Sequence, residues 1–215
     1  DADLESIFLD NYSTFSRGGL GQLLSGENWK GLDAENVYAG YFDHFNRSNN
    51  STLLGKMLYA DIKTYLHELL MKQDQMSMAA SIESRVPFLD HHLVEFAFSL
   101  PDELKIKGFD TKRILRAAFA EDIPKEILTR PKAGFPVPIK RWFANEYHDV
   151  ARKIILGDDS FCGSNFNREL IARYFELHRA GKYNYSDQIW TLLNIELWHT
   201  MYIREESWEK IKIAV

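Results

Sequence analysis

The chain has 215 residues, 45% of them hydrophobic and 27% charged, and its formal net charge is −5. That length and composition suit one globular domain or part of a larger one, and the acidic balance disfavours a general nucleic-acid binder. The single cysteine, Cys162, excludes an internal disulfide and a cysteine-rich zinc site. We expect a cytoplasmic protein that does not span a membrane, because no apolar run approaches ~18 residues and no signal segment is recognisable.

The N-terminal part of the sequence predicts breaks and loops, followed by one long helix. Residues 1–32 contain the segments SRGGLGQ and LLSGENWKG, and Gly19–Gly21 is typical of a plain turn, with only a weak hint of a phosphate loop. After a polar loop at 46–51, apolar residues recur at three- and four-residue spacing and predict one helix that runs toward Met76. Its apolar stripe consists of Leu58, Ile62, Tyr65, Leu66, Leu69 and Leu70.

Prolines divide the middle of the chain into shorter elements. Pro87 interrupts the first helix, and DHHLVEFAFSLP predicts a short buried helix that ends before Pro101. Asp110 or Thr111 is expected to cap the helix KRILRAAFAE. IPKEIL predicts one more turn, and three prolines hold an extended loop over 131–138.

Three longer helices are predicted near the C-terminus. IKRWFANEYHDVARKIILG ends at Gly157, and FNRELIARYFELHRAG ends at Gly181. Ser186 is expected to cap DQIWTLLNIELWHTMYI, which is apolar nearly all round and should be buried. Because no segment alternates β-branched residues over a useful length, we predict a mainly α chain of roughly six to eight helices.

The segment MSMAASIESRVPFLD, residues 76–90, places Glu83, Arg85 and Asp90 in an apolar frame. A buried charge is costly unless it is paired and hydrogen-bonded, so Arg85 could tie carboxylates and backbone carbonyls together at a helix end. This reasoning favours a structural role for Arg85 and Asp90. For Glu83, a structural role and contact with a ligand are equally supported.

A second charged segment, RPKAGFPVP at 130–138, carries Lys132 on a proline-rich loop in which Gly134 permits close backbone approach. Such a lysine is a point charge on a fixed base, which suits a phosphate; a solvated surface lysine is the equally supported alternative. Lys72 and Asp74 lie on the polar side of the preceding helix, where such pairs are common. The histidines offer no ligand set at a suitable spacing, so no metal site is predicted.

Three segments, taken in order, resemble the synthetase domain of the glutamine-hydrolysing asparagine synthetases. They are LLMKQDQMSMAASIESRVPFLDHHLVEFAFSLPDELK, TKRILRAAF and RPKAGFPVPIKRWF, within residues 55–145. ESRVPFLD and RPKAGFP at this separation make the resemblance specific. Residues 1–54 and 146–215 resemble the family more loosely.

The resemblance implies an ATP-dependent ligase. With ATP and Mg²⁺ the family adenylates the aspartate side chain to β-aspartyl-AMP and pyrophosphate, and ammonia from glutamine then releases asparagine and AMP. The family's glutaminase domain and its pyrophosphate loop, Ser-Gly-Gly-x-Asp-Ser, do not occur in this sequence. Residues 1–215 thus resemble the helical C-terminal portion of an α/β adenine-nucleotide α-hydrolase-like (PP-loop ATP pyrophosphatase) domain, trimmed from a longer enzyme. ATP and Mg²⁺ would be bound mainly by residues outside it.

The resemblance also implies roles for individual residues. Lys132 matches the family lysine that reaches the reacting phosphate and the acyl-adenylate, which would make it catalytic. Lys72, Asp74 and Glu83 match positions in or beneath the aspartate and adenylate cleft. Structural support of that cleft is expected from Arg85, Asp90 and Gly134.

Departures from the family pattern keep other functions open. Ser25–Glu27 imitates a second family loop, Ser-Gly-Glu/Asp-Gly-x-Asp-Glu, but Asn28 and Trp29 break the pattern. The family usually has a basic residue where Gln75 stands, so a related amidotransferase or a β-lactam synthetase-like enzyme acting on a different acid is an alternative, as is a non-catalytic helical module. The expected partners are aspartate, ATP and ammonia, with a homodimer among the assemblies the sequence allows. The 215-residue chain alone is expected to be inactive.

Overall fold

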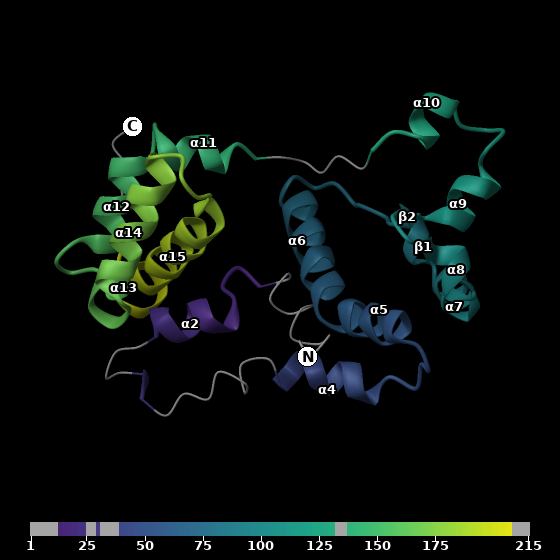
Figure 1. The fold of residues 1–215 in the computed structure, drawn as a ribbon, viewed down its shortest axis with the longest axis horizontal. Coiled ribbons are helices and arrows are strands. Elements are labelled where there is room, and N and C mark those ends of the chain that lie inside the picture. The colour runs from purple at the N-terminus through teal and green to yellow at the C-terminus, as the bar shows by residue number, and fades with distance from the viewer. Residues whose placement is uncertain (1–12, 25–28, 31–38, 132–136, 208–215) are drawn as a thin grey trace. The chain divides into compact units, whose positions relative to one another are not determined.

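The structure is a computed structural model that describes residues 13–24, 29–30, 39–131 and 137–207. It is mainly helical, as predicted, and it adds one short antiparallel hairpin (Figure 1). The chain divides into two compact units. Unit 1 comprises residues 1–34 and 135–215, and unit 2 comprises residues 35–134.

Unit 1 is a group of packed helices that draws on both ends of the sequence. Figure 1 shows α2, in purple, beside the green and yellow helices, although they are far apart in the chain, and α2 contacts α14. The described elements of unit 1 are α2 (Arg17–Leu23), α11 (Ile139–Ala144), α12 (His148–Leu156), α13 (Phe161–Asn165), α14 (Arg168–Arg179), α15 (Ser186–Trp198) and the π-helical η3 (His199–Ile203).

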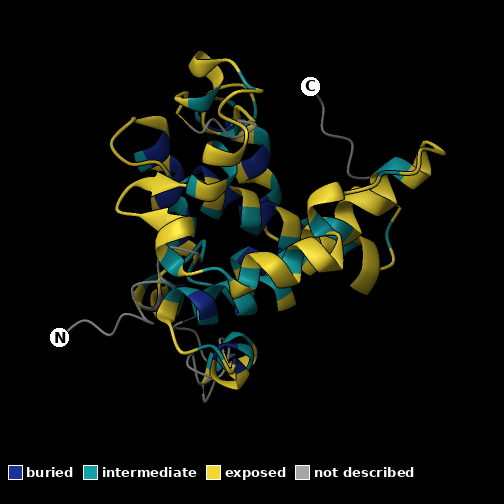
Figure 2. Ribbon diagram, turned by 90° about the vertical axis from the view of Figure 1, so that its right-hand side faces the viewer, coloured by how far each residue is buried: buried dark blue, intermediate teal, exposed yellow. Residues whose placement is uncertain are grey.

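The core of unit 1 forms from side chains that recur at helical spacing. In α14 the buried residues stand at i, i+3, i+4 and i+7 from Ile171 to His178, and α15 repeats this spacing from Ile189 to Glu196. Each helix therefore buries one face. Most of the buried residues, dark blue in Figure 2, belong to the helices of unit 1. Because Trp190 is 47% exposed, α15 is not buried all round, contrary to the prediction.

The segment around Gly19–Gly21 is helical, which corrects the prediction of a turn or a phosphate loop. Glycine disfavours a helix interior, but partners outside the helix stabilise both ends of α2. The Ser16 hydroxyl accepts a hydrogen bond from the Gly19 N–H at 3.2 Å, and the Asn167 N–H donates to the Leu23 carbonyl at 2.9 Å. Leu23 is also buried in the core. Tertiary contacts therefore override the weak intrinsic propensity of this segment.

Helix ends in unit 1 follow the sequence signals only in part. Asn167 caps α14 by accepting from a backbone N–H of the first turn, and Gly181 follows this helix at φ +67°. The single helix predicted over 139–157 is instead two helices, α11 and α12. At the break, Asn145 Nδ2 donates to the Arg141 carbonyl at 3.0 Å, which offers the backbone an alternative to helical hydrogen bonding.

A buried carboxyl group ties α15 to α13. Glu196 accepts two hydrogen bonds, from the Phe161 N–H at 2.9 Å and from the Cys162 N–H at 2.7 Å. Cys162 is fully buried, and its thiol donates to the Leu192 carbonyl at 3.4 Å. Burial, and then the neighbouring Glu196, raise the pKa of the Cys162 thiol well above its usual range. The thiol is therefore a protonated structural group and not a nucleophile.

We expect Cys162 to resist thiol reagents at pH 8 in the native chain and to react at once in urea. In the unfolded chain the thiol ionises above about pH 8.5, whereas the folded chain keeps its proton. The stability contributed by the raised pKa is therefore complete below that pH and is lost as the pH rises above it, by about 1.4 kcal/mol per unit.

Urea melts of the wild type and of Cys162→Ala at several pH values test this expectation. The stability difference between the two proteins should shrink above about pH 8.5. A difference that stayed constant up to about pH 10, or rapid native labelling at pH 8, would contradict it.

Unit 2 is a chain of short helices interrupted by turns and one hairpin. Strand β1 pairs with β2 in antiparallel register, Ile106 opposite Thr111. The described elements of unit 2 are α4 (Ala39–Arg47), α5 (Leu53–Lys63), α6 (Tyr65–Ala79), the 3₁₀ helix η2 (Pro87–Leu89), α7 (His91–Ser99), α8 (Asp102–Lys105), β1 (Ile106–Lys107), β2 (Asp110–Thr111), α9 (Arg113–Ala118) and α10 (Lys125–Leu128).

The long helix predicted toward Met76 is divided at Thr64 into α5 and α6. The backbone of Thr64 departs from helical geometry, with φ −116° and ψ −79°, and its hydroxyl donates to the Ala60 carbonyl at 2.8 Å. Such local side-chain bonds compete with the helix ladder. The apolar stripe read from the sequence therefore spans two helices.

Two predicted caps are also wrong. Asp110 and Thr111 form strand β2, and the residue before α9 is Lys112, at φ +56°. Ser186 is the first helical residue of α15, and its hydroxyl donates to Asn184 Oδ1 at 2.9 Å. Asp110 pairs instead with Arg113 and Arg116 of α9, and the turn before α15 engages the Ser186 hydroxyl, so neither side chain caps a helix.

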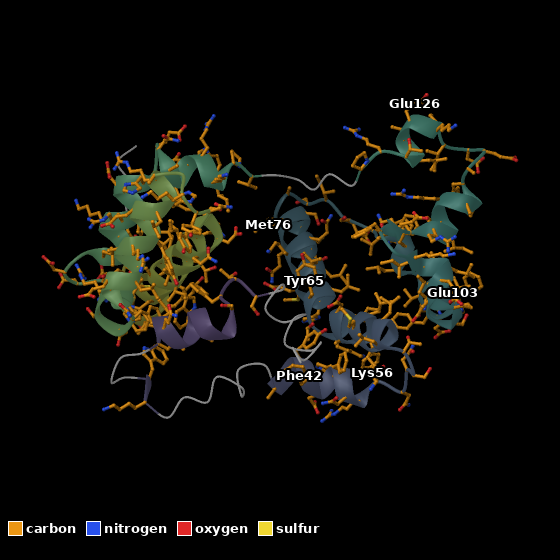
Figure 3. The ribbon with its side chains drawn as sticks, in the orientation of Figure 1. Phe42, Lys56, Tyr65, Met76, Glu103 and Glu126 are labelled. Atoms are coloured by element: carbon orange, nitrogen blue, oxygen red, sulfur yellow. The ribbon has the colours of Figure 1, made fainter. Side chains whose placement is uncertain are left out.

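Unit 2 leaves many large apolar side chains exposed. Figure 3 labels two of them on α6, Tyr65 and Met76, which are 47% and 70% exposed. Helix α7, predicted to be buried, contains no buried residue, and Phe96 within it is 58% exposed. Among the residues described, no helix has the length and apolar character required to cross a membrane.

Candidate functional site

The three segments of the sequence singled out above contribute to one cavity in unit 2, called here the motif cavity. Its volume is about 470 Å³. Phe88 of ESRVPFLD, Leu115 and Phe119 of TKRILRAAF, and Arg130 of RPKAGFP all line it. Residues 42 positions apart in sequence thus face one space, because η2, α9 and the segment after α10 meet there.

The motif cavity combines an apolar wall with three cations. Lys112, Arg116 and Arg130 line it beside leucine, isoleucine and phenylalanine side chains. Arg116 lies 3.9 Å from Asp110, whereas Lys112 and Arg130 are exposed and pair with no carboxylate among the described residues. Free cations beside an apolar wall suit a ligand that joins phosphate or carboxylate groups to an apolar or aromatic body.

A second cavity of about 460 Å³ lies between α6 and the segment 84–89. Leucines of α6, among them Leu66 and Leu70, line it together with Arg85 and Phe88. The Gln73 amide donates to the Ser84 hydroxyl at 2.7 Å and holds the two sides together. The ESRVPFLD segment therefore forms a wall beside α6, but one that is open to solvent.

The charges in this wall are not buried, contrary to the prediction. Arg85 pairs with Glu83 at 2.8 Å, and their side chains are 83% and 69% exposed. An ion pair this exposed contributes little to stability. Arg85 forms no ion pair with Asp90 within the described parts of the chain.

Asp90 has a separate and local role. Its carboxylate caps α7 by accepting from the N–H groups of His92 at 3.0 Å and Leu93 at 3.3 Å. An N-cap aspartate satisfies donors that the helix leaves free. Asp90 therefore fixes the direction in which the chain leaves the wall.

The remaining site residues predicted from sequence are only partly placed. Lys72 and Asp74 are exposed on α6, and neither side chain has an ion-pair partner among the residues described. They do not line the motif cavity. Lys132 and Gly134 lie outside the described residues, so their predicted roles are untested.

We expect Arg85→Ala to change the free energy of unfolding by no more than about 0.5 kcal/mol, because the lost ion pair is solvated. Asp90→Ala is the matched comparison and should cost about 1 kcal/mol, since it removes a helix cap. Urea melts followed by far-ultraviolet circular dichroism would distinguish the two variants. A loss of about 3 kcal/mol on replacing Arg85 would restore the buried-network hypothesis.

Sequence reasoning missed the three cations of the motif cavity. Their signal was weak, because Lys112 directly precedes α9 and Arg116 lies within it, and basic residues are common at such helix positions. As for a metal, no group of three or more His, Cys, Asp or Glu side chains in the described ranges is arranged to hold an ion.

Comparison with known proteins identifies the family. The family model for asparagine synthase matches residues 11–200. The chain is 36% identical over 203 residues to asparagine synthetase [glutamine-hydrolyzing] 1 of Bacillus subtilis. The matched region covers 94% of this chain and 31% of that protein.

Two further relatives are named as different kinds of protein. A putative glutamine-hydrolysing asparagine synthetase of Mycobacterium bovis is 34% identical over 93% of this chain and 30% of its own length. The amidase chry2 of Gibberella zeae is 30% identical over 45% of this chain and 16% of its own length. No solved structure matches the chain. The chain spans less than a third of the length of these curated relatives, and it belongs to the asparagine synthase family.

Proposed function

We propose that the chain forms part of an ATP-dependent ligase that adenylates the aspartate side chain and transfers ammonia from glutamine, giving asparagine, AMP and pyrophosphate. The observation that carries the proposal is the motif cavity, where all three family-like segments meet. Family membership and relatives named as glutamine-hydrolysing asparagine synthetases support it further. The chain would supply one wall of the synthetase site.

In this proposal the cations of the motif cavity face the phosphate groups of ATP. Lys112 and Arg130 have no carboxylate partner among the described residues. No existing ion pair there has to break when they bind an anion. The apolar wall formed by Phe88 and Phe119 suits an aromatic base. The loop that begins at Arg130 also carries Lys132, two residues further along.

Lys132 is proposed as the residue closest to the chemistry. Negative charge grows on the phosphate oxygens as pyrophosphate departs, and a fixed cation stabilises that state more than the ground state. Lys72, Asp74 and Glu83 are proposed to line the same cleft, with Gly134 allowing the loop to approach. Mg²⁺ would be held by residues outside this chain.

We further propose that unit 2 packs against the nucleotide-binding part of a PP-loop-type α/β domain. Large exposed apolar patches on a soluble domain mark surfaces that another protein part covers. Such side chains extend from α6 to α10, with Met76 at 70%, Phe88 at 64% and Ile127 at 55% exposed. The cytoplasmic location and the homodimer stay predictions.

The alternative that the observations support is a related enzyme acting on a different acid. A relative named as an amidase is similar in sequence to part of this chain. In addition, Gln75 stands where the family that the sequence resembles usually has a basic residue. Adenylation and amide transfer would be the same, and only the acid would differ. The motif cavity alone does not distinguish one small acid from another.

A chimera tests the proposal and its alternative together. In the Bacillus relative, the matching residues would be replaced by this chain. The chimera is expected to release pyrophosphate from ATP only when aspartate is present and to form asparagine from glutamine. A panel of other acids, including glutamate and a β-amino acid, would reveal a different acceptor.

Glutamine hydrolysis provides the control for folding of the chimera. If glutaminase activity is retained but no acid supports pyrophosphate release, the ligase proposal is wrong. The isolated 215-residue chain should show no aspartate-dependent exchange of pyrophosphate into ATP, because its sequence lacks the pyrophosphate loop.

A further inference from the structure

A polar cavity in unit 1 shares no lining residue with the motif cavity. It is called here the tyrosine cavity, and its volume is about 390 Å³, within the range usual for small-molecule sites. Residues near α2 form one side, and α14 and the start of α15 form the other. The residues that matter for a ligand are Gln22, Arg173, Tyr174, Tyr185 and Gln188.

The walls of the tyrosine cavity are held in place by contacts within unit 1. Tyr174 and Tyr185 stack with ring centroids 4.5 Å apart. The Gln188 amide donates to the Thr14 carbonyl at 2.6 Å and joins α15 to the N-terminal segment. The cavity is therefore built from positioned side chains and not from a loose surface.

Several hydrogen-bond donors of this cavity have no partner within the described residues. The Tyr174 side chain is mostly buried, and its hydroxyl, at the cavity wall, makes no hydrogen bond to another described residue. The Arg173 guanidinium forms no ion pair, and the Tyr185 hydroxyl is also free among these residues. These donors line one cavity, so a single ligand bound there can accept hydrogen bonds from all of them.

The free groups define the chemistry of that partner. A guanidinium and two phenols all donate hydrogen bonds, and no acidic residue lines the cavity. One cation matches one negative charge, which favours a carboxylate over a doubly charged phosphate. We propose that the tyrosine cavity binds a small carboxylate-bearing molecule of about amino-acid size, with its carboxylate on Arg173 and the Tyr174 hydroxyl.

Tyr174 is suited to remain a donor throughout the working pH range. Burial, and then the neighbouring Tyr185, raise the pKa of its hydroxyl. The hydroxyl therefore stays protonated and can donate to a carboxylate. Gln22, across the cavity on α2, has a side-chain amide that could meet the distal polar group of such a molecule.

Isothermal titration calorimetry on the full chain tests the proposal. The probes are L-glutamine and succinate as carboxylates, succinamide as a neutral analogue, and inorganic phosphate. We expect saturable binding of at least one carboxylate with one site per chain, and none of succinamide. Tyr174→Phe keeps the stacked ring but removes the hydroxyl, and it should weaken binding about tenfold, as Arg173→Gln should.

Arg152→Gln, an exposed arginine on α12 that does not line the cavity, is the matched control and should leave binding unchanged. Unchanged melting of Tyr174→Phe would show that its fold is intact. The proposal is overturned if no carboxylate binds at about 10 mM, if phosphate alone binds, or if both variants bind as tightly as the wild type.

Discussion

Replacing Glu196 with alanine is expected to lower the free energy of unfolding of unit 1 by roughly 2–4 kcal/mol. Glu196 is only 3% exposed and accepts the N–H groups of both Phe161 and Cys162. Alanine would leave these two donors without an acceptor, and each buried unpaired donor costs about 1–3 kcal/mol. Helix α13 would lose its link to α15.

Tryptophan fluorescence in urea measures this effect selectively, because all five tryptophans lie in unit 1. Glu176→Ala removes an exposed carboxylate from α14 and serves as the control, with an expected change within about 0.5 kcal/mol. Glu196→Gln keeps one acceptor oxygen and should fall between the two. Equal midpoints for Glu196→Ala and Glu176→Ala would show that the two hydrogen bonds contribute nothing.

In the active chimera or complete enzyme, Lys132→Ala is expected to lower the rate of asparagine formation by a hundred- to a thousandfold. That loss corresponds to about 2.7–4 kcal/mol of transition-state stabilisation, the usual cost of removing one well-placed donor. ATP binding should weaken far less, because the charge develops only as pyrophosphate departs. Lys132→Arg should rescue incompletely, since a planar guanidinium does not replace a compact ammonium.

Lys125→Ala, an exposed lysine of α10 close by in sequence, is the control for loss of charge. It should leave both kcat and KM near those of the parent enzyme. Glutamine hydrolysis should survive in every variant. If Lys132→Ala instead raised the KM for ATP and left kcat unchanged, Lys132 would bind ATP without a catalytic role.

Helical periodicity and the glycines that follow α12 and α14 allowed part of the fold to be predicted. Helices α14 and α15 were located correctly because buried stripes such as Ile171 to His178 repeat without interruption. The breaks at Thr64 and Asn145 were missed, since each depends on one polar side chain that bonds back to the helix. Helix α2 was missed for the opposite reason, because Asn167, distant in sequence, supplies its C-terminal partner.

The candidate site was less predictable than the fold. Sequence showed which segments matter, but an apolar frame around Arg85 suggested burial where the side chain is 83% exposed. Apolar neighbours in sequence do not imply burial when the surrounding surface has no covering partner in the same chain. The motif cavity itself could not be predicted, because it depends on how η2, α9 and the segment up to Arg130 fold together.

The two-segment construction of unit 1 also determines the order in which the protein can assemble during synthesis. Helix α2 leaves the ribosome before all of unit 2, whereas its packing partner α14 is made only afterwards. A glycine-containing helix this short does not persist alone in water. Helix α2 therefore cannot form stably in the nascent chain until Asn167 and the core residues around Phe175 have been translated. Closure of unit 1 is thus a late event that depends on contacts distant in sequence.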